Sequence, residues 1–81
     1  MRMAAYDRFD ATFLPVLAAA AGTSLTAARL RERADDPFAA PLVQEWLDEA
    51  FHRGLVNVRR QADLPSDWRL TARGRRAARR L

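Results

Sequence analysis

The spacing of apolar residues changes at Gly54, and this change restricts the chain to a helical part followed by a short β part. Before Gly54, residues 41–53 repeat apolar side chains every three or four positions, which is the period of an α-helix. After it, residues 55–60 and 68–71 alternate apolar and polar side chains, which is the period of a strand. The sequence therefore predicts a long helix followed by a hairpin with strands near 55–60 and 68–71.

A proline complicates the first predicted helix. Apolar residues from Tyr6 onward have helical spacing, but Pro15 inside a helix would lose a hydrogen bond and clash with the preceding turn. A break near Asp10–Thr12 would remove the conflict, because Thr12 could then cap the helix and Pro15 would lie in its first turn. We therefore expect a short leading helix or turn and then a helix over about 12–21.

The second and third helices complete the predicted helical core. Thr26 can cap a helix over 27–34, and Pro41 starts the helix over 41–53. The buried side of that third helix is predicted to contain Leu42, Val43, Trp46, Leu47 and Ala50. Its exposed side is polar and holds Gln44, Glu45, Asp48, Glu49 and His52. The predicted fold is therefore mainly α, with one small hairpin.

Charge is distributed unevenly along the chain. Residues 1–52 hold five arginines and eight acids, whereas residues 53–81 hold nine arginines and two aspartates. Thr71 can cap a last helix, 72–81, on which the arginines fall on one side: Arg73, Arg75, Arg76, Arg79 and Arg80. This asymmetry indicates an anionic partner for the carboxyl-terminal third, and nucleic acid is the first candidate.

Length and composition exclude several classes of protein. The 81 residues are enough for a single domain, 1–81, which would comprise an N-terminal extension, 1–11, a central core and an arginine-rich last helix, 72–81. The chain has no cysteine, which excludes disulfides and thiolate sites. Its longest apolar run, 13–21, is too short for a membrane span. A cytoplasmic protein that does not bind membranes is expected.

Four segments together resemble the winged helix-turn-helix domain of bacterial PadR- and MarR-like regulators. They are FLPVLAAAAG at 13–22, LTAARLRER at 25–33, VQEWLDEAFHRGLVNVRR at 43–60 and WRLTARGRR at 68–76. The resemblance covers about residues 12–78 and implies a three-helix core, a two-stranded wing and a carboxyl-terminal helix. It further implies that the third helix enters the major groove of duplex DNA while the wing contacts the adjacent backbone. Such regulators dimerise through added helices, so the resemblance allows a homodimer.

The DNA-binding residues expected on this basis come from the third helix, the wing and the last helix. Gln44 could pair with adenine and Glu45 could accept from cytosine, whereas the arginines would contact phosphates. The full set is Gln44, Glu45, Arg59, Arg60, Arg69, Arg73 and Arg76.

The acidity of the third helix departs from the pattern expected of a recognition helix. Its exposed side carries Glu45, Asp48 and Glu49 and no arginine, and carboxylates near a polyphosphate oppose docking. Either the wing and the last helix supply the basic residues, or this side binds a basic protein, which is the alternative function. No enzyme, cofactor or metal is expected, because Ser24 and Ser66 lack a base and the acidic side lacks a full ligand set.

Overall fold

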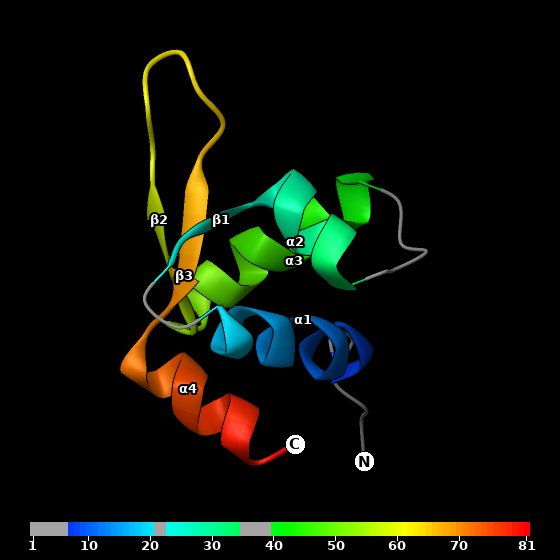
Figure 1. Cartoon of the computed structure of the whole chain (residues 1–81). Coiled ribbons are helices and arrows are strands. Elements are labelled where there is room, and N and C mark those ends of the chain that lie inside the picture. Colours follow the sequence, from blue (N-terminus) through cyan, green and yellow to red (C-terminus); the bar gives the residue numbers. More distant parts are fainter. Residues whose placement is uncertain (1–6, 21–22, 35–39) are drawn as a thin grey trace.

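The computed structural model describes residues 7–20, 23–34 and 40–81. Its elements are α1 (Asp7–Ala19), β1 (Leu25–Thr26), α2 (Ala27–Ala34), α3 (Ala40–His52), β2 (Val56–Arg59), β3 (Asp67–Leu70) and α4 (Ala72–Arg79). The fold is mostly helical with a small three-stranded antiparallel sheet, as predicted for a mainly α fold with a hairpin. The hairpin of β2 and β3 rises beyond the helices at one end, and α4 lies at the opposite end (Figure 1).

The sheet has a third strand that the sequence pattern did not predict. β3 lies in the centre, with β2 on one side and β1 on the other, and both pairs are antiparallel. Leu25 of β1 pairs with Trp68 of β3. The alternation in β2 and β3 correctly predicted the hairpin, but a strand of two residues has too few positions to show a period.

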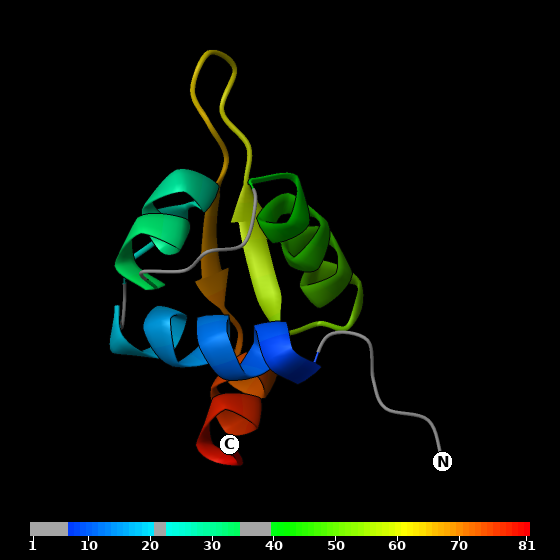
Figure 2. The same cartoon turned by 90° about the vertical axis from the view of Figure 1, so that its right-hand side faces the viewer.

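The core lies between the sheet and α1, α2 and α3, which cover one of its faces (Figure 2). Its largest fully buried side chains are Trp46, Phe13, Leu14, Leu30, Leu47, Val43 and Val56. Trp68 is buried too, so both tryptophans belong to the core. The prediction for Leu42 is wrong: its side chain is 42% exposed, because it lies at the edge of the buried side of α3.

The predicted break in the first helix is absent. α1 is continuous from Asp7 to Ala19 with Pro15 inside it, so residues 7–11 are helical and not an extension. Thr12 does not cap a helix; its hydroxyl donates a 3.0 Å hydrogen bond to the Arg8 carbonyl one turn earlier. Proline has no backbone N–H, so the Ala11 carbonyl one turn earlier receives no hydrogen bond from position 15. Ala11 and Pro15 are both exposed, so water can donate a hydrogen bond to this carbonyl instead. The predicted end of this helix at 21–22 lies outside the described residues.

A partly buried cluster of polar groups fastens α1 to α3. The Asp10 carboxylate accepts 2.7 Å bonds from Nε1 of Trp46 and Nη2 of Arg53, and a 3.0 Å bond from Nη1 of Arg53. Burial by itself would raise the pKa of Asp10, but these hydrogen bonds and the charge of Arg53 together lower the pKa below its ordinary value. The hydrogen bonds to Asp10 likewise raise the pKa of Arg53. Asp10 therefore helps to set the position of α3, whose outer side carries candidate functional residues.

The junction of α3, β2 and α4 is closed by a glycine and a threonine. Gly54 follows α3 with a φ of +77°, a conformation that favours glycine. Thr71 caps α4, accepting a 3.0 Å bond from the Gly74 amide, and its hydroxyl donates a 2.6 Å bond to the Gly54 carbonyl. This arrangement confirms the predicted cap and holds α4 at the foot of the sheet.

Candidate nucleic-acid interface

Two of the predicted DNA-binding residues, Gln44 and Arg60, line one groove. The groove has a volume of about 350 Å³ and lies between α3, the hairpin and the start of α2. Its walls are Thr26, Ala27, Ala28, Gln44, Arg60, Pro65, Ser66 and Trp68. They include a guanidinium, an amide, two hydroxyls and the N-terminal end of a helix, but no carboxylate. These are the groups that bind a phosphate and position an adjacent base edge.

The start of α2 is ordered by its own cap. The Thr26 side chain accepts a 3.1 Å hydrogen bond from the Arg29 amide, as predicted. Strand β1 precedes the helix directly and is paired to β3, so the first turn of α2 is held against the hairpin. The partial positive charge of this helix end therefore has a fixed place in the groove.

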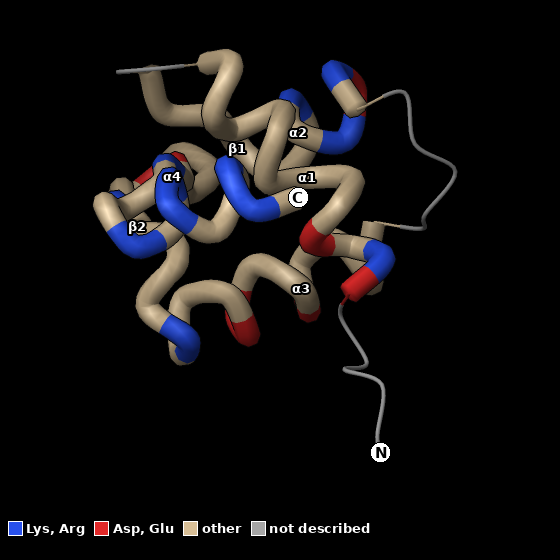
Figure 3. The backbone as a smooth tube through the Cα atoms, turned by 90° about the horizontal axis from the view of Figure 1, so that it is seen from below, with Lys and Arg blue, Asp and Glu red and all other residues tan. Residues whose placement is uncertain are grey.

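Glu45 does not line the groove. It lies on the exposed side of α3 with Asp48, and Glu49 is half-buried. Asp48 accepts a 3.1 Å hydrogen bond from the Gln44 amide, which orients the Gln44 side chain along the helix. Figure 3 shows the acidic positions of α3 and the basic positions of α4 in separate parts of the molecule.

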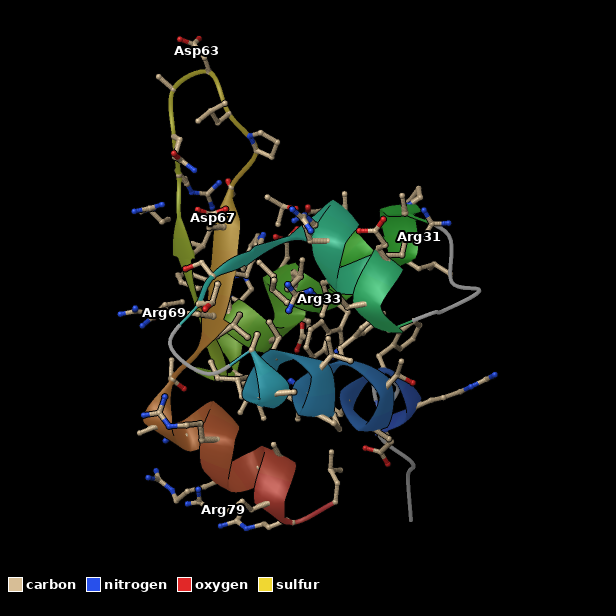
Figure 4. All side chains as sticks on the ribbon, viewed as in Figure 1. Arg31, Arg33, Asp63, Asp67, Arg69 and Arg79 are labelled. Carbon is tan, nitrogen blue, oxygen red and sulfur yellow. The ribbon has the colours of Figure 1, made fainter. Side chains whose placement is uncertain are left out.

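Two arginines of the hairpin, Arg59 and Arg69, lie on the side of the sheet away from the groove. Arg59 pairs with Asp67 across the strands, and Arg69 pairs with Asn57. All four residues alternate with the more buried residues of β2 and β3, so they lie on the face that the helices leave uncovered. Arg69 projects from β3 away from the helices (Figure 4). Arg59 and Arg69 therefore do not share a surface with Gln44 and Arg60.

The remaining predicted residues, Arg73 and Arg76, are exposed on α4. Nη1 of Arg73 donates a 3.3 Å hydrogen bond to the Arg53 carbonyl, at the end of α3. Asp63 lies at the hairpin tip, and α4 lies at the opposite end of the molecule (Figure 4). The seven predicted residues are thus distributed over several surfaces, and only Gln44 and Arg60 share the groove.

Two arginines outside the predicted set, Arg75 and Arg79, line hollows where α4 lies beside α1. Arg75 lines one hollow together with Arg69 and another together with Arg79. The arginine side of the last helix includes both Arg75 and Arg79, so the sequence pattern held a signal for them. The proximity of Arg75 to the sheet depends on how α4 packs beside α1 and β3.

The groove and the arginines are the principal features of the described chain. No group of histidine and acidic residues in 7–20, 23–34 and 40–81 is arranged to hold a metal ion. Over the same ranges, no helix is long and apolar enough to cross a membrane. Comparison with protein-family models and with curated proteins finds no match.

Proposed function

We propose that this chain is a small winged-helix DNA-binding protein, a transcriptional regulator or accessory DNA-binding factor that acts by binding alone. The observation that carries the proposal is the groove in which Gln44 and Arg60 meet the start of α2. Arg60 and the helix end would hold one phosphate of the DNA backbone. Gln44 would then face a base edge, for which an amide is suited to adenine. The proposal includes a cytoplasmic location.

The order and arrangement of the elements support the same proposal. Three helices cover one face of the sheet, and the hairpin extends past the start of α2 and α3 (Figures 1 and 2). In a winged helix, the third helix and the wing contact the same duplex. The groove of this chain likewise lies between α3 and the hairpin, which supports the proposal.

Titration of a labelled DNA duplex at several salt concentrations tests the proposal. Each phosphate contact contributes about 0.9 to the slope of log K against log salt, so Arg60→Ala is expected to weaken binding and lower the slope by about that amount. Arg33→Ala is the matched control, because Arg33 is an exposed arginine outside the groove. The control is expected to keep the parent slope. A parent protein that binds no duplex at about 50 mM salt, where phosphate contacts are strong, would refute the proposal.

An interaction with a basic protein is the second candidate, and the exposed side of α3 favours it. Glu45 and Asp48 lie there between two apolar side chains, Leu42 and Phe51, which are 42% and 43% exposed. Charged residues beside exposed apolar ones are typical of interaction surfaces. The test replaces Leu42 and Phe51 by Ser. A variant that no longer binds a basic partner but binds DNA like the parent would support this candidate.

A further inference from the structure

Three adjoining hollows lead from the uncovered face of the sheet to α4 and to the part of α1 beside it. The first, about 290 Å³, contains Arg59 and Arg69; the second, about 370 Å³, contains Arg69 and Arg75. The third, about 520 Å³, lies between α1 and α4 and contains Arg75 and Arg79. Each hollow shares an arginine with the next, so these four residues form a continuous arginine row from β2 across β3 to α4.

The spacing within this arginine row follows from the secondary structure. Arg59 and Arg69 are diagonal neighbours on paired strands, and such positions are about 7–8 Å apart. Arg75 and Arg79 are four residues apart on α4, which brings their Cβ atoms to about 5–6 Å. Repeated cations at such separations repel one another, and an anion with several charges that lies across them reduces this repulsion.

Little negative charge compensates the row. Asp67 is the single carboxylate that lines the three hollows, and it is bound to Arg59 at 2.9 Å and to the Gln61 amide at 3.2 Å. In the described part of the chain, no carboxylate forms an ion pair with Arg69, Arg75 or Arg79. All three are exposed, so a ligand can reach them.

The row is separate from the groove of the proposed function. The three hollows and the groove have no lining residue in common. Arg59 and Arg60 are consecutive, yet Arg59 lines the first hollow and Arg60 lines the groove. A duplex that contacts only the residues of the groove therefore leaves the arginine row free.

We propose that the arginine row binds the backbone of a second nucleic-acid duplex, so that one chain bridges two duplexes. The inference rests on the proposed function for the first duplex. A row of exposed cations suits repeated phosphodiesters, and contacts with phosphates carry no sequence information. The second contact is accordingly expected to be independent of sequence.

A bridging assay with the full chain tests the proposal. One duplex is fixed to beads, and retention of a second, fluorescent duplex of the same sequence is measured after addition of protein at about 50 mM salt. The parent is expected to retain the second duplex, and the double variant Arg69→Gln with Arg75→Gln is expected to lose at least about nine-tenths of that retention. Its binding to one free duplex should change by no more than about twofold, because one of two sites remains.

The charge-matched control is the double variant Arg33→Gln with Arg80→Gln, in which neither residue lines a hollow of the row or the groove. It is expected to bridge like the parent; an equal loss in this control would overturn the proposal, since net charge alone would explain bridging. Persistent bridging by the row variant would also overturn it, because a dimer using two copies of the groove would behave in that way. If the parent binds one duplex but retains no second one, only the proposal for the arginine row is refuted. If the parent binds no duplex, the proposed function is refuted.

Discussion

Trp46 and Asp10 are joined by a 2.7 Å hydrogen bond from the indole nitrogen to the carboxylate, although they lie on α3 and α1 respectively. The same carboxylate forms an ion pair with Arg53 at the end of α3. A tryptophan that is fully buried thus has its one polar atom satisfied by a carboxylate that is itself paired. Together these contacts fix α3 along its length, because Trp46 lies in its middle and Arg53 follows its last residue.

Replacement of Asp10 by Asn is expected to lower the free energy of unfolding by about 2 kcal/mol at neutral pH. The negative charge is lost, and Asn keeps only one of the two oxygens that accept from Trp46 and Arg53. The folded protein lowers the pKa of Asp10 below its ordinary value of 3.8, so its contribution is complete above that value. It is lost as pH falls through the lower pKa of the folded state. Urea unfolding of parent and variant should therefore differ at pH 7 and converge in acid.

Asp63→Asn is the control for this prediction, because Asp63 is an exposed aspartate at the hairpin tip (Figure 4). It is expected to unfold like the parent at every pH. A difference between parent and Asp10→Asn that stayed constant down to about pH 2, well below the ordinary range for aspartate, would contradict the assignment of the pH dependence to Asp10.

Replacement of Trp46 by Ala is expected to cost about 3–5 kcal/mol. Trp46 is fully buried, and its ring lies 5.2 Å from that of Phe13. A domain with a total stability of about 5–15 kcal/mol would become marginal or unfold. Phe51→Ala removes an aromatic ring that is 43% exposed and should cost less than about half as much. Equal melting temperatures for Trp46→Ala and the parent would show that the ring contributes nothing to the core.

Replacement of Gly74 by Ala is expected to destabilise the fold by about 1–3 kcal/mol, although alanine favours helices. A Cβ atom at this position would collide with the Leu55 carbonyl oxygen and lie 2.9 Å from a methyl group of Leu70. Thermal unfolding measures the effect, with Arg76→Ala, an exposed position on the same helix, as the control. A Gly74→Ala protein more stable than the parent would mean that α4 can move away from Leu55 at no cost.

Neutralising the acidic side of α3 is expected to strengthen binding to duplex DNA. The triple variant replaces Glu45 by Gln, Asp48 by Asn and Glu49 by Gln. A charge near the surface contributes about 0.3–0.5 kcal/mol, so the three together correspond to about a fivefold to tenfold gain in affinity at low salt. Glu32→Gln, an exposed acid on α2, is the control and should have little effect. Weaker DNA binding by the triple variant would mean that the carboxylates read bases, whereas loss of a basic partner would favour the protein-binding alternative.

Local sequence signals were sufficient to predict most of the helices and strands. The caps Thr26 and Thr71, the glycine after α3 and the two apolar periods act within a few residues, so their consequences follow from the sequence. The start of α1 did not follow from such signals. Pro15 favours a break there, but Asp10 and Phe13 contact α3 across the core and keep the helix continuous.

For the candidate site, local patterns in the chain were enough to predict which residues leave the core: alternation in β2 and β3 turns Arg59 and Arg69 outward, and helical spacing places the arginines of α4 on one side. The chain had to fold before it was clear that Gln44 meets Arg60 in one groove, whereas Arg69 shares one hollow with Arg59 and another with Arg75. Period and capping are set by neighbours in the chain. Which surfaces come together is set by the packing of α3 and α4 against the sheet, through contacts between residues distant in sequence.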